Sequence, residues 1–170
     1  ATVAGTLTGV IKDVQVGGVI NISGNFNVGG IAGFMLVADA TSPPEISNVH
    51  VGTGNLTNKG LGEGAPAYLS AGGLLGGAFG GRIENASAAI HVTWDRTDAS
   101  MSISVSNSTA AGGAVGRAVL LTLSDVHTTG DVEGIHAVGG VFGSITNEMD
   151  EACTLSNLTS SGEIVGVGGG

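Results

Sequence analysis

The stretch Val138-Gly139-Gly140-Val141-Phe142-Gly143 decides the fold, because close copies of it recur along the chain. The clear copies read Val28-Gly29-Gly30-Ile31-Ala32-Gly33, Ala71-Gly72-Gly73-Leu74-Leu75-Gly76 and Ala111-Gly112-Gly113-Ala114-Val115-Gly116. A further copy begins at Val167-Gly168-Gly169-Gly170, and we expect a degenerate one at Val16-Gly17-Gly18-Val19-Ile20. The copies share the pattern Gly-Gly-aliphatic-X-Gly at spacings of about 27 to 43 residues, which is typical of a repeat architecture.

A second motif, aliphatic-X-Asn/Asp-aliphatic, alternates with the glycine motif. Its polar corner residues are Asp13, Asn48, Asn85, Asp125 and Asn157. Asx residues tolerate left-handed backbone angles and bond to nearby backbone groups. We therefore expect each of these residues to hold a bend, where the alternation of apolar and polar positions slips by one residue.

Apolar and polar residues alternate within each repeat, as in Val49, His50 and Val51, which is the period of a strand with one buried face. Helical periodicity is absent. Short strands, corner residues and a fixed repeat predict an all-β fold: a β-solenoid, or parallel β-helix, of about five repeats with flanking loop insertions. Equivalent residues should stack in ladders about 4.8 Å apart. A Gly-rich β-sandwich with coincidental repeats is the alternative.

The motif residues are given a structural role in this prediction. The glycines would let backbones pack closely, and the aliphatic residues, together with Val115, would point inward. The set comprises Gly30, Ile31, Gly33, Gly73, Leu74, Gly76, Gly113, Gly116, Gly140, Val141 and Gly143.

Composition places residues 1–170 in a single domain and limits the partners. The chain has 14 acidic and 5 basic residues and a formal net charge of -9. The basic residues are scattered singly, so no patch can neutralise a run of phosphates, and a nucleic-acid partner is not expected. Cys153 is the only cysteine, and no stretch of about 18 apolar residues predicts a transmembrane segment.

The insertions between repeats are the expected places for binding. They are assigned to residues 35–45, 58–68, 93–102 and 144–153. The first contains two prolines and the third contains Trp94.

The alternation of the two motifs resembles the GLUG-motif repeat, whose Gly-Leu-X-Gly core Gly73-Leu74-Leu75-Gly76 matches literally. The resemblance spans roughly residues 7 to 170 through the tandem copies, and it departs at Gly113-Ala114-Val115-Gly116, where Ala replaces the larger aliphatic. Proteins of this family look like secreted or surface-anchored microbial adhesins. The resemblance therefore implies an extracellular or cell-surface structural repeat and brings no catalytic residues.

Metal binding is weighed against a surface role for two sets of residues. His50 and His127 occupy equivalent, outward-facing positions with one turn between them, and about 9 to 10 Å is too far for one ion to bridge. Glu148, Asp150 and Glu151 could supply oxygen ligands to Ca²⁺, but their spacing is neither that of an EF-hand loop nor that of the GGxGxD nonapeptide, and a solvated acidic loop is the favoured interpretation. No cofactor is otherwise expected.

Carbohydrate binding is the alternative function. Trp94 and Tyr68 could contact a glycan on the flank, and Asp95, Arg96 and Asp98 are the best candidates for a polysaccharide-cleaving site. An ion pair in a surface loop is the simpler interpretation of those charges, so no catalytic residue is assigned. Five Asn-X-Ser/Thr sequons, at Asn21, Asn55, Asn85, Asn107 and Asn157, are possible glycosylation sites.

The favoured function is a non-enzymatic, extracellular, structural or adhesive element, with a host or matrix glycan or protein as a possible ligand. The chain begins without Met and stops within a repeat, which we interpret as a processed chain or part of a longer one. Residues 3–10 and 164–170 look like uncapped solenoid turns. We therefore expect further repeats or other copies of the chain at both ends, and possibly head-to-tail filaments.

Overall fold

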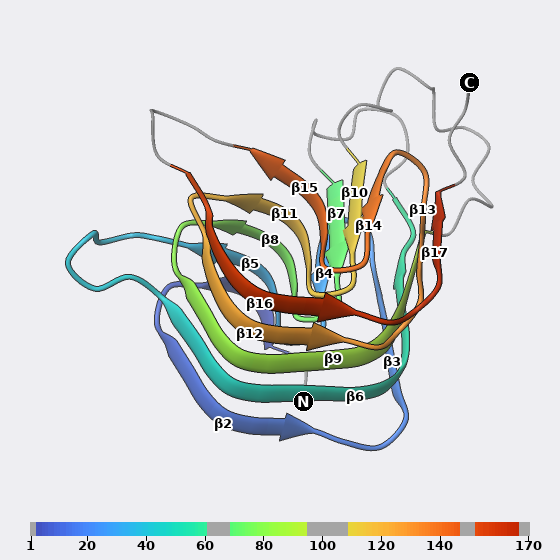
Figure 1. Cartoon of the computed structure of the whole chain (residues 1–170), viewed down its shortest axis with the longest axis horizontal. Coiled ribbons are helices and arrows are strands. Elements are labelled where there is room, and N and C mark those ends of the chain that lie inside the picture. Colours follow the sequence, from blue (N-terminus) through green and yellow to red (C-terminus); the bar gives the residue numbers. More distant parts are fainter. Residues whose placement is uncertain (1–2, 61–68, 95–108, 147–151, 167–170) are drawn as a thin grey trace.

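The computed structural model of the chain describes residues 3–60, 69–94, 109–146 and 152–166. Within these residues all regular elements are strands, and the strands pair in parallel. The chain winds through three sheets in about four turns (Figure 1). The predicted β-solenoid is confirmed, and the sandwich alternative is wrong because sandwich sheets are antiparallel.

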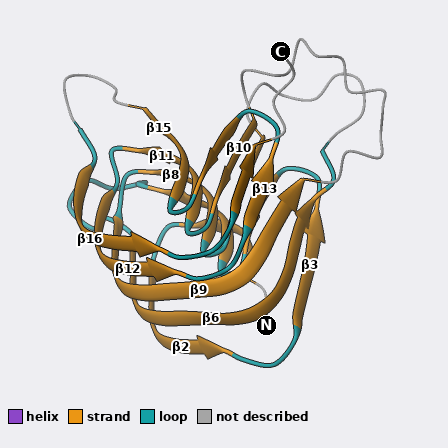
Figure 2. Cartoon of the chain, turned by 45° about the vertical axis from the view of Figure 1, so that its right-hand side comes forward, coloured by secondary structure: helices purple, strands orange, loops and turns teal. Residues whose placement is uncertain are grey.

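The largest sheet has eight strands, whose long rows lie one above another in Figures 1 and 2. These strands are β2 (Val10–Val16), β3 (Ile20–Gly24), β6 (Glu45–Asn58), β9 (Arg82–Trp94), β12 (Thr122–Thr128), β13 (Val132–Gly134), β16 (Thr154–Ser160) and β17 (Ile164–Gly166). β6 and β9 each cross the whole width of the eight-stranded sheet, whereas two shorter strands cover the same width in each of the other turns.

The other two sheets are narrower. The five-stranded sheet contains, in spatial order, β1 (Val3–Leu7), β5 (Ala32–Leu36), β8 (Leu75–Phe79), β11 (Val115–Val119) and β15 (Phe142–Thr146). The four-stranded sheet contains β4 (Asn27–Gly29), β7 (Leu69–Gly72), β10 (Thr109–Gly112) and β14 (Ala137–Gly139). Each full turn passes from the four-stranded sheet to the five-stranded sheet and then to the eight-stranded sheet.

The glycine motif joins the four- and five-stranded sheets at a point where their backbones touch. A Cβ atom on Gly72 would lie 2.1 Å from the carbonyl oxygen of Leu75 and 2.6 Å from the amide nitrogen of Gly116 in the next turn. A Cβ on Gly116 would lie 2.5 Å from the carbonyl oxygen of Gly76. No side chain fits at these distances, so the motif needs glycine for close backbone approach, as predicted.

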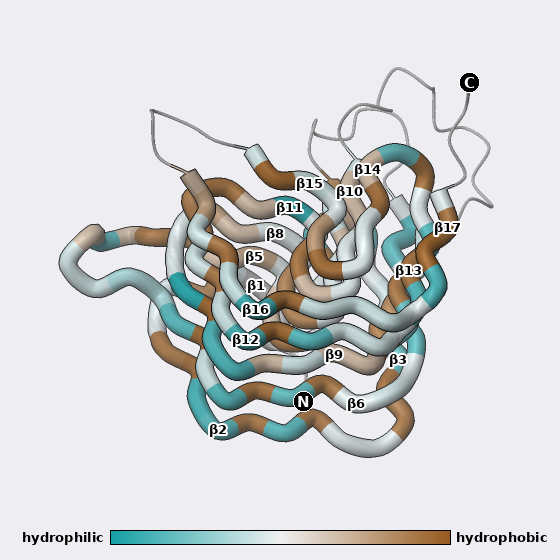
Figure 3. Tube along the Cα trace, in the orientation of Figure 1, coloured by the Kyte–Doolittle hydropathy of each residue, from teal (hydrophilic) through white to brown (hydrophobic). Residues whose placement is uncertain are grey.

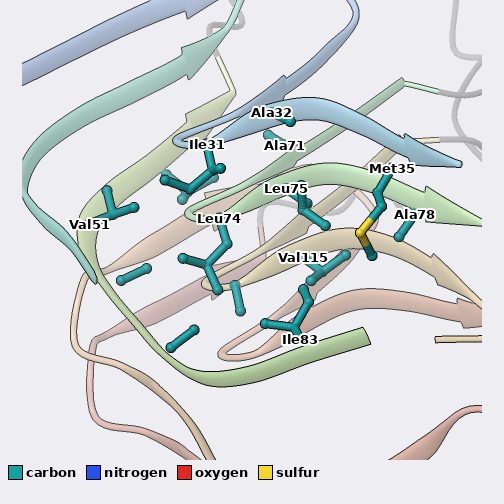
Figure 4. Packing of buried hydrophobic residues seen from close by; sticks show 14 of the residues in the cluster. Ile31, Ala32, Met35, Val51, Ala71, Leu74, Leu75, Ala78, Ile83 and Val115 are labelled. Carbon is teal, nitrogen blue, oxygen red and sulfur yellow. The ribbon is translucent and has the colours of Figure 1, made fainter. Parts of the chain in front are cut away.

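The aliphatic residues of the motif point inward (Figure 4). Ile31 is 2% exposed and Leu74 and Val115 are fully buried, whereas Val141, in the last turn, is only half-buried. The prediction of a degenerate copy at residues 16–20 is wrong. Gly17 and Gly18 lie exposed between β2 and β3 and not at a junction of the two narrow sheets. A Gly-Gly pair alone does not specify the junction.

The core is built of stacked aliphatic residues from successive turns. Ile46, Ile83 and Leu123 share one register and are fully buried. Brown and teal segments alternate along the rows of the eight-stranded sheet in Figure 3, as expected for strands with one buried face.

All four predicted insertions are shorter than expected. The third begins inside β9, which ends at Trp94, and the fourth begins inside β15, which ends at Thr146. Met35 is fully buried in β5 and Glu45 begins β6, so the first loop covers only residues 37–44 (Figure 1). Asn58 is a fully buried residue at the end of β6. In each case the pairing of neighbouring turns extends the strands into segments that look loop-like by composition.

Candidate functional site

The corner residues form a ladder along the eight-stranded sheet, which we call the Asx ladder: Asp13, Asn48, Asn85, Asp125 and Asn157. Their φ angles are 55°, 53°, 49°, 54° and 49° respectively, all in the left-handed region. The residues on either side pair in register from turn to turn. The predicted bend at these positions is confirmed.

Hydrogen bonds between the ladder side chains run in one direction. The Asn48 Nδ2 donates to Asp13 Oδ1 at 2.6 Å, and the Asn85 Nδ2 donates to Asn48 Oδ1 at 3.2 Å. The Asn157 Nδ2 donates to Asp125 Oδ1. Each amide therefore donates toward the N-terminal turn, and each run of bonds ends on a carboxylate.

Burial falls from the central turns to the two ends of the solenoid. Leu123 is a fully buried member of one aliphatic row. The last member of this row, Leu155, is 41% exposed, and the first member, Ile11, is half-buried. The row through Val92 and Val132 behaves in the same way, because its last member, Ile164, is 48% exposed. The end turns thus present residues that the central turns bury.

We define the N-terminal end surface as the open edges of β1, β2 and β3. Among the described residues each of these strands is paired on one side only, with β5 or β6. Val10 is 58% exposed on this surface, and Ile11, Val14 and Ile22 are half-buried against the core. The surface combines free backbone groups with aliphatic side chains.

The C-terminal end surface consists of the open edges of β15, β16 and β17. In the described part of the chain these strands pair only with β11, β12 and β13. Ile145 is 43% exposed, Leu155 41%, Ile164 48% and Val165 40%.

Charges near the ends are few. The Lys12 Nζ lies 3.1 Å from the Glu45 Oε1, and the Lys12 hydrogen bond, followed by that of Ser47, holds the pKa of the Glu45 carboxyl below its ordinary value. The Lys12 side chain is 52% exposed and the Glu45 side chain 27%, so water screens the pair and it contributes little to stability. Glu163 is exposed next to β17, and its backbone N–H donates to Asp131 Oδ1 at 2.8 Å.

The predicted role of Trp94 as a glycan contact is wrong, because its side chain is buried. It is 3% exposed and packs in the hydrophobic core at the end of β9, so its ring offers no platform to a sugar. The cause is visible in the alternation of Ile90, Val92 and Trp94, which are all buried on the inward phase of one strand. Tyr68, Asp95, Arg96 and Asp98 lie outside the described residues.

The structure does not bring His50 and His127, two residues considered as metal ligands, into a metal-binding cluster. His50 and His127 are exposed, as predicted, and their Nδ1 atoms lie 2.9 Å from Ser87 Oγ and 2.7 Å from Thr159 Oγ1. Within the described ranges no three His, Cys, Asp or Glu side chains gather where they could hold a metal ion. Glu148, Asp150 and Glu151 lie outside the residues that the structure describes.

Four of the sequons lie on strands of the eight-stranded sheet. Asn21, Asn55, Asn85 and Asn157 are all exposed, and Asn107 lies outside the described residues. The Asn55 Nδ2 donates to Asn21 Oδ1 at 3.3 Å, so these two already pair across turns. Glycosylation stays a prediction.

Asn58 is a polar residue that connects the eight-stranded sheet to the four-stranded sheet, and the sequence motifs did not predict this role. The buried Asn58 Nδ2 donates to the carbonyl oxygens of Phe26 at 2.6 Å and Ser70 at 3.2 Å, and its Oδ1 accepts from the Gly60 N–H at 3.0 Å. Its position on the inward phase of the β6 alternation was the available signal.

Comparisons with known proteins give one match. Residues 67–93 match the family model described as the GLUG motif, and this segment contains β7, β8 and nearly all of β9, which together form one turn of the solenoid. No curated protein and no solved structure matches the chain. The described residues include no helix that is long and apolar enough to cross a membrane. The sequence of one turn of this β-solenoid, residues 67–93, is therefore similar to the GLUG motif.

Proposed function

We propose that the chain is a non-enzymatic structural element of the extracellular surface whose two ends associate with further copies to build a filament. The observation that carries this proposal is the pair of end surfaces. Both have unpaired strand edges beside aliphatic side chains of the inward rows, which are the half-buried Ile11, Val14 and Ile22 at one end and the exposed Ile145, Leu155 and Ile164 at the other.

Open strand edges are sites of association unless they are covered. Free N–H and C=O groups on an edge strand pair readily with another strand, and solenoids need polar capping turns to stay single. In this chain the first and last turns carry aliphatic residues in the inward rows, as the central turns do. Ile11 and Leu155, the two ends of one row, are examples. Stacking a further turn on either end would bury these side chains and satisfy the free backbone groups.

The extracellular and adhesive part of the proposal is supported by the GLUG motif and by the outward face of the eight-stranded sheet. This face carries rows of polar side chains such as Gln15, His50 and His127, which suit contact with a hydrated matrix. Immunogold labelling of intact source cells should place the protein on their surface. Label found only inside permeabilised cells would overturn this assignment.

Sedimentation velocity at several concentrations, followed by negative-stain electron microscopy, tests the assembly. We expect the sedimentation coefficient to rise with concentration and uniform fibres to appear. Leu155→Lys should abolish both by placing a charge on an end surface, whereas Ser87→Lys, the same charge on a central turn, should not. Single particles of the wild-type chain at every concentration would contradict the filament.

A further inference from the structure

We propose that a second copy docks head-to-tail in one defined register, with β2 of one copy parallel to β16 of the other and Ile11 opposite Leu155. This inference rests on the proposed assembly and deepens it. It names the contacts of the joint, which the filament proposal leaves open.

The register is the one that the molecule already uses between its own turns. Ile11 pairs with Ile46, Ile46 with Ile83, Ile83 with Leu123 and Leu123 with Leu155. The first and last strands of this row therefore carry the same pattern of inward and outward residues and leave opposite edges open. A joint in the same register is a continuation of an interface that occurs four times within the chain.

The aliphatic rows meet without a break in this register. A shift by one residue would turn the inward side chains of one copy outward, so the buried row selects the register. The pairs across the joint are Ile11 with Leu155, Val14 with Leu158, Ile22 with Ile164 and Leu7 with Ile145.

Polar residues on the outer face also fit. The Asn21 Oδ1 accepts a bond from Asn55, so the Asn21 amide nitrogen faces the open N-terminal end. The Glu163 carboxylate falls opposite it across the joint, because Asp131 and Glu163 continue the same row. An amide donor thus meets a carboxylate acceptor.

The remaining outer pairs bring no like charges together. Lys12 falls opposite Ser156, and Gln15 falls opposite Thr159. The one imperfect contact places Asp13 opposite Asn157, whose Nδ2 is already bonded to Asp125. The same succession of Asn and Asp occurs inside the chain between Asn85 and Asp125, so the solenoid accommodates it.

Disulfide trapping in the full chain tests the register. Cys153→Ser removes the native thiol, and Gln15→Cys with Thr159→Cys then places two outward cysteines opposite each other across the joint. Register partners lie about 4.8 Å apart, within the reach of a disulfide. Within one chain the same two positions are about 19 Å apart, four strand spacings, so any bond that forms joins two copies.

The control is Gln15→Cys with Ser156→Cys in the same background, which separates the cysteines by about 10 Å across the joint. We expect a ladder of covalent multimers on a non-reducing gel from the first pair and no multimers beyond a dimer from the second or from either single cysteine.

The outcomes separate this inference from the proposed function. Sedimenting multimers that are trapped equally by both pairs, or by the control alone, would overturn the register and leave the assembly intact. Absence of multimers for the wild type and all variants would overturn both. A ladder from the first pair alone supports both.

Discussion

At the scale of single residues, the Asx ladder shows what a repeated polar residue contributes. Asp13, Asn48, Asn85, Asp125 and Asn157 each adopt a left-handed backbone that most residues avoid, and this requirement made them recognisable in the sequence. The direction of their side-chain bonds could not be predicted, since it depends on which amide atom faces which turn. The burial of Trp94 could have been predicted from its phase in β9, had its aromatic character not favoured a binding role.

Asp125→Asn should stabilise the fold by completing the ladder. The Asn85 Nδ2 donates to Asn48, so the Asn85 Oδ1 faces Asp125, and an ionised carboxylate has no proton to give it. An amide at position 125 can donate to Asn85 and still accept from Asn157. Urea denaturation should show a free energy of unfolding higher by about 1 kcal/mol.

Glu133→Gln is the control for this change, because it removes one negative charge outside the ladder. An equal gain in both variants would attribute the effect to net charge and not to the hydrogen bond.

At the scale of the element, one turn is the unit that the sequence specifies. The Gly-Gly motif, the corner Asx and the alternating strand recur in order, and β7, β8 and β9 show how they follow one another. The sequence predicted this unit because each part has a local cause. It did not predict where the strands end, since β6 and β9 are extended by pairing with each other, which is a property of the stack.

Gly116→Ala should be severely destabilising. Its Cβ would lie 2.5 Å from the carbonyl oxygen of Gly76 and 2.6 Å from the amide nitrogen of Ala71, and both atoms belong to backbone that cannot rotate away. We expect a loss of about 3 kcal/mol or more in thermal or urea unfolding.

Gly17→Ala is the matched control, because nothing lies within 4 Å of its Cβ position. It should leave stability unchanged or raise it by up to about 1 kcal/mol through the unfolded chain. Similar losses in both variants would mean that the close approach of the two sheets is not what the motif glycine serves.

At the scale of the whole molecule, the fold was predictable and the site was predictable only in its location. Tandem motifs indicated a solenoid and the positions of its first and last described turns, but the residues of the end surfaces are ordinary members of the aliphatic rows. Leu155 differs from Leu123 in exposure alone, and exposure depends on what is stacked on each row. No local pattern in the sequence distinguishes the two.

Asp13→Asn should tighten the association between copies. The amide at position 13 would accept from Asn48 as before and would donate to the Asn157 Oδ1 of the next copy. One added hydrogen bond corresponds to a dissociation constant lower by about fivefold in sedimentation equilibrium.

Asp125→Asn serves as the control here, because it repairs the same mismatch inside the chain and should leave the association constant as it is. A fall in the dissociation constant for both variants, or for neither, would contradict the role assigned to Asp13.

The one-way hydrogen bonding of the Asx ladder gives the molecule a chemical polarity. Copies joined head-to-tail would all orient their amides alike, so a fibre would finish in a carboxylate of Asp13 at one tip and in an amide oxygen of Asn157 at the other. Two unlike tips add subunits at unequal rates. A labelled seed would grow faster at one tip than at the other. A fibre anchored at one tip would add subunits at a rate set by the groups on its free tip.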